Sequence, residues 1–261
     1  MILADGMRDG VEVELRIAKA KGKKMQRSID LYGDKIGKVE YVEHMGSDLT
    51  IVNSARVSFG KQKDALDEKD EKLIKYLIKH KHTSTLEHNI VTLRFCVPLF
   101  VRSQHHRHRT WSYNEISRRY TDVDIKFYEP ESFRTQHKSN RQASNNELIN
   151  PDMNEFSNRA LPVTPYHASE AVKNHHYRSM ELYKKLLTNG VCREQARAVL
   201  PQGLYTEYYG TCNLNNMIKF IELRTHEGAQ WEIQQVAKAC LDICEGLWPK
   251  TIGAYREVRG L

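Results

Sequence analysis

The residues best suited to chemistry are concentrated between Arg102 and Arg119, a segment that reads RSQHHRHRTWSYNEISRR. It holds five arginines and one glutamate, hence a net charge of +4 out of +7 for the chain. A guanidinium group binds phosphate through two parallel hydrogen bonds. Ser112 and Ser117 add short donors, and Glu115 can hold a neighbouring arginine or a sugar hydroxyl in place. The segment therefore predicts a pocket for a small phosphorylated ligand.

A metal site is one alternative, because His105, His106 and His108 stand close together in this segment. Arg107 and Arg109 argue against it. At about 7 Å and an effective dielectric constant of about 20, each guanidinium would repel a divalent cation by roughly 5 kcal/mol. The segment has no cysteine, and its one carboxylate does not offset that repulsion. We therefore predict no metal here.

A basic protein that binds RNA or single-stranded DNA is the main alternative function. Arginines of residues 102–119 would contact phosphates, while Trp111 and Tyr113 would stack on bases. The segment is poor in lysine, however, whereas exposed surfaces that follow a phosphate backbone usually carry both cations. It also lies beside a stretch whose pattern indicates a buried strand. These features favour the small-ligand pocket, so we expect neither a nucleic-acid nor a membrane partner.

The elements that must position this segment do not alternate regularly between strand and helix. Apolar residues recur at helical spacing in some stretches and alternate with polar ones in others. Strands are predicted at 38–44, 89–97, 125–128 and 204–212. Helices are predicted at 67–81, from Pro98 onward, and at 168–188, 193–200, 213 onward and 231–246. This order predicts an α+β fold, with helices packed on a modest mixed or antiparallel sheet.

Composition limits the class of protein further. The 261 residues are 40% hydrophobic, which suits one large domain or two small ones. No apolar run approaches the roughly 20 residues of a membrane span, and the N-terminus lacks a signal-peptide pattern. Five scattered cysteines indicate the reducing cytoplasm rather than a disulfide framework. We expect an N-terminal extension at 1–30 and one domain at 31–261, with a polar insertion at about 130–165.

Several segments, in order, resemble the flavin-dependent thymidylate synthases. Arg107-His108-Arg109, followed after seven residues by Ser117, matches the RHR-x7-S signature of that family. Four further stretches resemble family segments and are NSARVSF at 53–59, HTSTLEH at 82–88, REQARAVLP at 193–201 and LRTHEGAQWEIQQ at 223–235. The resemblance covers about residues 38–129 and 168–250.

The resemblance implies an α+β enzyme that converts dUMP to dTMP. Such enzymes take the methylene group from 5,10-methylenetetrahydrofolate and electrons from NADPH by way of FAD. They form homotetramers whose active sites are shared between subunits, and they need no protein nucleophile. Consistent with this, none of the five cysteines stands in a basic motif that would lower its pKa.

The resemblance also implies two overlapping sets of site residues. The positions that match dUMP-binding residues are Gln104, Arg107, Glu115, Ser117, Arg118, Arg119, Arg197 and Arg224. The positions that match FAD-binding residues are His82, Ser84, Glu87, Arg107, His108, Arg109, Glu115, Asn213, Asn215 and Lys219. Arg224 is the implied catalytic residue, because it resembles the arginine that contacts the uracil and favours its N3-ionised form.

One helix can present two of these residues together. Asn213 and Arg224 are eleven residues apart, about 16 Å along an ideal helix, and at 100° per residue they fall on nearly the same face. Asn215 and Lys219 stand where the family commonly has arginine and asparagine. A relative that binds nucleotide but has lost flavin turnover is therefore an alternative, beside the nucleic-acid-binding protein.

Overall fold

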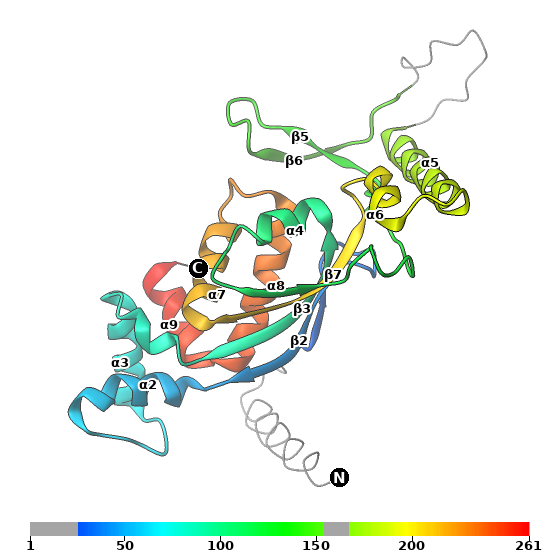
Figure 1. Cartoon of the computed structure of the whole chain (residues 1–261). Helices are drawn as coiled ribbons and strands as arrows, with labels where there is room; N and C mark the ends of the chain where they lie inside the picture. Colours follow the sequence, from blue (N-terminus) through cyan, green and yellow to red (C-terminus); the bar gives the residue numbers. More distant parts are fainter. Residues whose placement is uncertain (1–25, 154–166, 261) are drawn as a thin grey trace.

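A five-stranded antiparallel sheet, in the order β1-β2-β3-β7-β4, forms the centre of the chain (Figure 1). The computed structural model describes residues 26–153 and 167–260. The strands of this sheet are β1 (Ser28–Asp30), β2 (Lys38–Met45), β3 (Ile90–Pro98), β4 (Ser112–Glu115) and β7 (Tyr205–Asn213). β3 and β7 pair along nine residues, with Ile90 opposite Asn213 and Pro98 opposite Tyr205. This long ladder joins the segments before and after the insertion.

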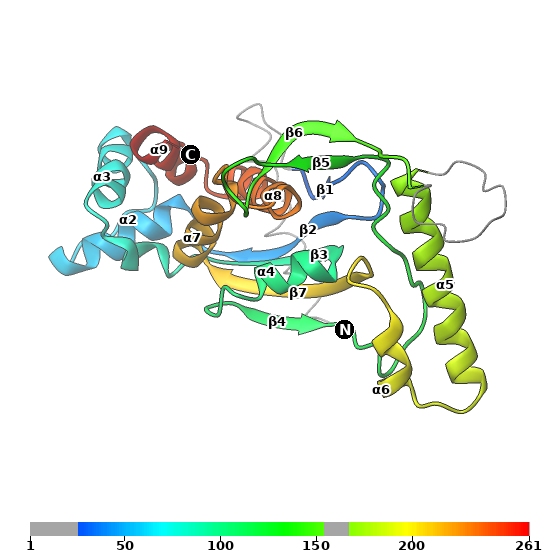
Figure 2. The same ribbon diagram turned by 90° about the horizontal axis from the view of Figure 1, so that it is seen from above.

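Helices cover one face of this sheet (Figure 2). They are α4 (Leu99–His105), α7 (Leu214–Thr225) and α8 (Trp231–Leu247). Alternation along β3 directs Val91, Leu93, Phe95 and Val97 into the layer between sheet and helices, where all four are 0% exposed. Each such side chain stabilises the fold by about 1.5–3 kcal/mol relative to exposure. The predicted α+β architecture is confirmed.

The two ends of the sheet carry different helices, as Figures 1 and 2 show. At one end lie α2 (Asp48–Arg56), η1 (Val57–Phe59), α3 (Glu68–Lys79), η2 (Thr83–Leu86) and α9 (Pro249–Arg259). At the other end lie α5 (Ala168–Thr188), α6 (Arg193–Ala196) and η4 (Arg197–Val199). A second, smaller core holds the latter group together and contains Tyr183, Ala196, Leu200 and Leu204.

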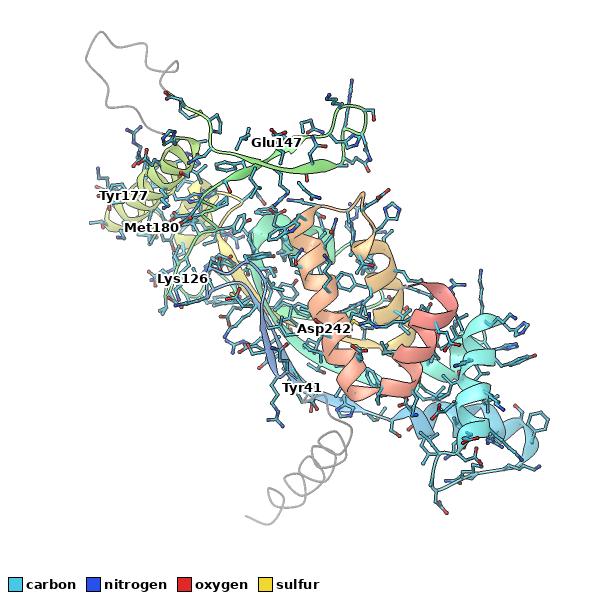
Figure 3. The ribbon with its side chains drawn as sticks, turned by 180° about the vertical axis from the view of Figure 1, so that it is seen from behind. Tyr41, Lys126, Glu147, Tyr177, Met180 and Asp242 are labelled. Carbon is cyan, nitrogen blue, oxygen red and sulfur yellow. The ribbon has the colours of Figure 1, made fainter. Side chains whose placement is uncertain are left out.

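The polar insertion contains a hairpin that the sequence pattern did not predict. β5 (Phe133–Gln136) and β6 (Ser144–Ile149) pair as a separate antiparallel sheet. Both strands are mostly polar and no residue of either is fully buried, so they lack the apolar alternation that marks a strand. Viewed from behind in Figure 3, Glu147 of this hairpin lies apart from Asp242 in the helical layer. Residues 1–25 and 154–166, which belong to the predicted extension and insertion, lie outside the described residues.

Most of the predicted elements are confirmed, and the differences have local causes. α5 begins and ends at the predicted residues, and Asn213 caps α7 as expected. Pro98 is the N-cap of α4 rather than its first residue, because its ψ of 152° is extended. The predicted strand at 125–128 is reduced to a single bridge between Phe127 and Leu204. α2, α9, β1 and β4 were not predicted. Among residues 26–153 and 167–260, no helix could span a membrane.

Asp70, in the first turn of α3, should make the free energy of unfolding depend on pH in the acid range. Its side chain is fully buried. Burial alone raises the pKa of Asp70, but hydrogen bonds from Lys63, the Asp67 backbone and Arg56 outweigh it and lower the pKa to about 2. Since the folded-state value lies below the unfolded one, this stabilisation is complete above about pH 4 and is lost as pH falls toward 2.

The test compares urea unfolding of the wild type with an Asp70→Asn variant between pH 7 and pH 2. The gap in unfolding free energy should narrow as pH falls below about 4. Asp64→Asn, at an exposed position just before α3, should have nearly the same unfolding free energy as the wild type throughout this pH range. A gap of constant size at every pH would contradict the assignment.

Candidate active site at the α4–β4 loop

The loop between α4 and β4 projects the RHR motif, and one side chain holds its shape. The Tyr113 hydroxyl lies 3.0 Å from the His105 carbonyl oxygen and 3.1 Å from that of His108, and it can donate to either. The Tyr113 ring also stacks on His106, with 4.1 Å between centroids. Arg107 and Arg109 are consequently left exposed on an anchored turn.

The three neighbouring histidines lie in different surroundings, and His105 is the one enclosed in the core. His105 is 0% exposed, and its Nδ1 lies 2.8 Å from the hydroxyl of Tyr208. Burial, with the nearby charges of His108, His106 and Arg224, lowers the pKa of His105 well below its ordinary value, so it is neutral. Within the described part of the chain, no group of three His, Cys, Asp or Glu side chains could hold a metal ion.

Arg224, in the last turn of α7, joins two of the other predicted residues. Its Nε donates to Nε2 of His108 at 3.2 Å, and its Nη2 donates to the Gln104 carbonyl oxygen at 3.2 Å. The Gln104 amide in turn donates to the side-chain oxygen of Gln230, six residues beyond Arg224. Gln104, His108 and Arg224 are therefore brought together, although His108 was predicted for flavin and Gln104 for dUMP.

The contact with Arg224 requires His108 to accept a hydrogen bond. Burial, followed by the charge of Arg224, lowers the pKa of His108 to about 4. Its ring is therefore neutral at physiological pH, with a lone pair on Nε2 for the Arg224 Nε–H. Arg224 uses two of its five N–H donors in these contacts, and three remain for a ligand.

Titration of His108 gives a direct test of this arrangement. In the protein without ligands, its side-chain NMR signal should titrate near pH 4. In an Arg224→Gln variant the midpoint should rise, because the charge that opposes protonation is gone. The titration of His106, whose pKa is lowered by burial and by the charge of Arg102, should be the same in both proteins. A His108 midpoint that does not change would show that Arg224 exerts no influence there.

Glu115 is held by an arginine to which the sequence pattern gave no role. Arg102 donates through Nε to both carboxylate oxygens, at 3.1 and 2.9 Å, and through Nη2 to Oε2 at 2.6 Å. The Thr206 hydroxyl donates to Oε1 at 2.7 Å. Glu115 thus realises the first of its predicted uses, holding a neighbouring arginine in place. The sequence offered a signal for this pair, because Arg102 is the first residue of the same basic segment that contains Glu115.

A second group of predicted residues gathers where η2 meets the start of α7. Glu87, just after η2, accepts a hydrogen bond from the buried Asn215 amide at 2.8 Å. Asn213 uses its side-chain oxygen to cap α7. The other members of this group, all exposed, are His82, Ser84 and Lys219.

A third group lies toward the opposite end of the sheet, near α6. Arg119 pairs with Glu194 of α6 at 3.1 Å, and its backbone N–H donates to Ser117 Oγ at 3.3 Å. Arg118 donates to the carbonyl oxygen of Val123 at 2.8 Å, so its guanidinium serves its own loop. Arg197, in η4, is exposed. Figures 1 and 2 place α6 far from α2 and α3, beside which the second group lies.

Comparison with known proteins identifies the family. A family model described as thymidylate synthase complementing protein matches residues 40–250. The chain belongs to this family, the flavin-dependent thymidylate synthases. It is 41% identical to the flavin-dependent thymidylate synthase of Thermus thermophilus, over 85% of this chain and 76% of the relative. It is 39% identical to that of Kosmotoga olearia, over 84% of this chain and 90% of the relative.

Solved structures of the same fold support the assignment. The chain resembles the UMP/dUMP methylase PolB of Streptomyces cacaoi bound with 5-Br dUMP, with a TM-score of 0.71 and 30% identity over 88% of this chain and 97% of that one. The same enzyme with 5-Br UMP gives a TM-score of 0.69 and 31% identity over 84% and 94%. These relatives give no support to the nucleic-acid-binding alternative.

The site residues suit the flavin in the family's name. FAD carries a pyrophosphate, and its reduced ring carries negative charge, so it needs cations and N–H donors. Among the described residues, Arg107, Arg109 and Lys219 are exposed and have no carboxylate partner within ion-pair distance. Such groups can turn toward an anion without breaking a contact in the fold. The family's flavin therefore fits the donor set of this chain.

Proposed function

We propose that the chain makes dTMP from dUMP, using 5,10-methylenetetrahydrofolate, NAD(P)H and FAD. The observation that carries the proposal is the contact of Arg224 with His108 and Gln104, beside the anchored RHR loop. The names of the relatives and the dUMP-analogue complex of PolB support the same chemistry. Glu115, Ser117, Arg118, Arg119 and Arg197 complete the proposed nucleotide set.

Arg224 is the proposed catalytic residue. Its free N–H donors would bind the O4 and N3 edge of the uracil, and its fixed charge would stabilise negative charge on the ring. When bound, the flavin supplies the hydride that the reaction requires. His108 and the Gln104 carbonyl hold the guanidinium in place beforehand, so little reorganisation is needed when substrate arrives.

The proposed route uses no protein nucleophile, and the thiols agree with this. All five cysteines are free, and four of them are buried. Burial raises the pKa of Cys96 to about 12 and raises the pKa of Cys212, Cys240 and Cys244 as well. These four thiols stay protonated at neutral pH and are poor nucleophiles. Free thiols also support the proposed cytoplasmic location.

We further infer a homotetramer with shared active sites. The three groups of predicted residues lie at separate places on one chain, whereas in the proposed assignment one flavin and one nucleotide contact all of them. Pairing of subunits would bring the group near α6 of one copy against the RHR loop of another. Mixing an Arg224→Ala protein with an Arg119→Ala protein should then restore part of the activity that each lacks, and sedimentation should give four copies.

The decisive experiment combines colour and turnover. The purified full chain should be yellow and release FAD on denaturation, and it should form dTMP from dUMP, methylenetetrahydrofolate and NADPH. Omission of any one of these co-substrates should stop the reaction. A colourless protein that cannot be reconstituted with FAD would overturn the proposal. Salt-dependent binding of oligonucleotides by a protein without FAD would favour the alternative function instead.

A further inference from the structure

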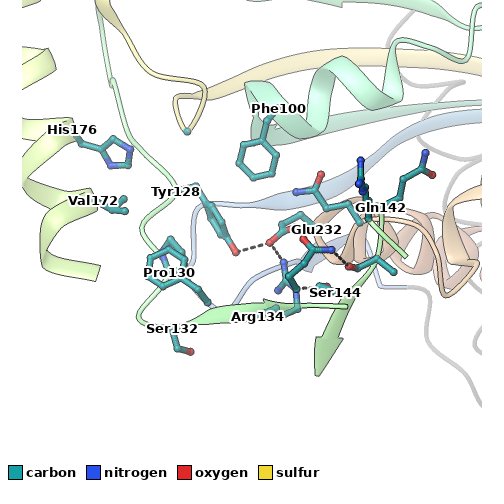
Figure 4. A pocket seen from close by; sticks show the side chains of 16 residues that line it. Phe100, Tyr128, Pro130, Ser132, Arg134, Gln142, Ser144, Val172, His176 and Glu232 are labelled. Atoms are coloured by element: carbon teal, nitrogen blue, oxygen red, sulfur yellow. Dashed lines mark hydrogen bonds and ion pairs between the residues drawn. The ribbon is translucent and has the colours of Figure 1, made fainter. Parts of the chain in front are cut away.

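A pocket of about 430 Å³ opens between the β5–β6 hairpin, the start of α4 and the N-terminus of α8 (Figure 4). Its volume is in the range of small-molecule sites, about 300–1,000 Å³. None of the predicted site residues lines it. It nevertheless adjoins the site, because Gln230 is part of its wall and also accepts the hydrogen bond from Gln104.

One wall of the pocket is a fixed ion pair. Glu232 is 3% exposed, and it accepts hydrogen bonds from the Tyr128 hydroxyl at 3.2 Å and from Arg134 of β5. The Arg134 guanidinium also lies over Trp231, 4.9 Å from the ring centroid, and donates to the Ser144 hydroxyl at 3.2 Å. These charges cancel one another, so they shape the pocket and leave its binding chemistry to other residues.

The remaining lining combines an apolar, partly aromatic wall with polar side chains such as Gln136 and Gln142, and it carries one further arginine. The rings of Phe100 and Tyr128 lie 5.8 Å apart at 57°, and Phe133 and Pro130 extend this apolar surface. Arg141, in the turn between the hairpin strands, has no carboxylate partner within ion-pair distance among the described residues. The pocket therefore suits a ligand with a flat aromatic ring and an anionic end.

We propose that this pocket holds the p-aminobenzoyl-glutamate tail of the reduced folate, with one of the two glutamate carboxylates at Arg141. The inference rests on the proposed function, which requires a folate whose binding residues the sequence did not specify. The benzoyl ring would lie against Phe100 and Tyr128, and the reacting end of the folate would point past Gln230 toward Gln104. A dinucleotide would bring several phosphates to a pocket with one unpaired cation, whereas the tail can keep its second carboxylate in solvent.

The test uses an Arg141→Gln variant of the full, FAD-loaded protein. Its KM for methylenetetrahydrofolate should rise about tenfold or more, the worth of one charge-assisted hydrogen bond, while its KM for dUMP stays unchanged. Lys138→Gln is the matched control, because it removes a positive charge from the same turn outside the pocket. p-Aminobenzoyl-L-glutamate should bind the wild type in calorimetry, compete with methylenetetrahydrofolate, and bind Arg141→Gln at least tenfold more weakly.

The outcomes separate this proposal from the proposed function. An active enzyme with the same folate KM in both Arg141→Gln and wild type would overturn the tail site and leave the reaction standing. A rise confined to the KM for NADPH would overturn it in favour of a dinucleotide. Binding of p-aminobenzoyl-L-glutamate at Arg141 by a protein that makes no dTMP would support the pocket and refute the proposed reaction.

Discussion

Replacing Arg224 with alanine is expected to lower the rate of dUMP-dependent oxidation of the reduced flavin by about 10²–10³-fold, while FAD stays bound. Arg224 is half-buried, and its contacts with His108 and Gln104 fix the direction of its free donors. Removing a preorganised donor from such a site weakens the interaction with charge that develops in the transition state. The measurement is anaerobic stopped-flow spectroscopy of the reduced flavin in the presence of methylenetetrahydrofolate, with and without dUMP.

Two further variants make this result specific. Arg224→Lys keeps a positive charge but loses the planar fork, so it should recover only part of the rate. Arg256→Ala removes an arginine from the last turn of α9, where it pairs with Glu245 at 3.2 Å, and should leave the rate unchanged. Wild-type turnover in Arg224→Ala would refute the catalytic assignment, and loss of FAD would show that Arg224 acts mainly in flavin binding.

Replacing Arg134 with alanine should lower the stability of the protein more than any other substitution proposed here. The variant leaves the Glu232 carboxylate buried without its cation, which costs roughly 3–5 kcal/mol for a buried pair. Because the Arg134 side chain is 21% exposed, we expect a loss near the lower limit. For a chain of this size, about 3 kcal/mol corresponds to a fall in Tm of roughly 6–12 °C. Scanning calorimetry gives this value.

A double variant identifies the cause of that loss. Arg134→Ala combined with Glu232→Gln has no buried charge, so it should regain a large part of the stability. Lys138→Ala, elsewhere on the hairpin, should change Tm little, because that side chain is exposed. If the single and double variants were equally unstable, the loss would come from packing against Trp231 rather than from the unpaired carboxylate.

Local sequence signals predicted the three long strands β2, β3 and β7 and most of the helices. The boundaries of α5 and the Asn213 cap of α7 follow from short-range patterns, which depend on residues three or four positions apart. The hairpin strands lack such a pattern, and one of them is fastened by Arg134 to Glu232, 98 residues away. Pro249, in the first turn of α9, is the kind of residue that marks a helix start, so this helix could have been predicted.

The residues of the candidate site are proposed from the resemblance, whereas the contacts among them come from the structure alone. The resemblance placed Gln104 and Arg224 in the dUMP set and His108 in the FAD set, whereas the structure joins Arg224 to His108 across 116 positions of the chain. That contact depends on the nine-residue register of β3 with β7 and on how α7 packs over it. The pairing of Glu115 with Arg102 could have been predicted from the sequence, because the two residues are only 13 positions apart.

α7 also limits how the chain can evolve in length. The helix starts at the Asn213 cap and carries Arg224 in its last turn, so the two are separated by a fixed number of residues. One inserted or deleted residue would rotate Arg224 by about 100° and turn it away from His108 and Gln104. We expect homologous chains to keep this interval constant, and length differences to accumulate in the polar segment beyond the β5–β6 hairpin.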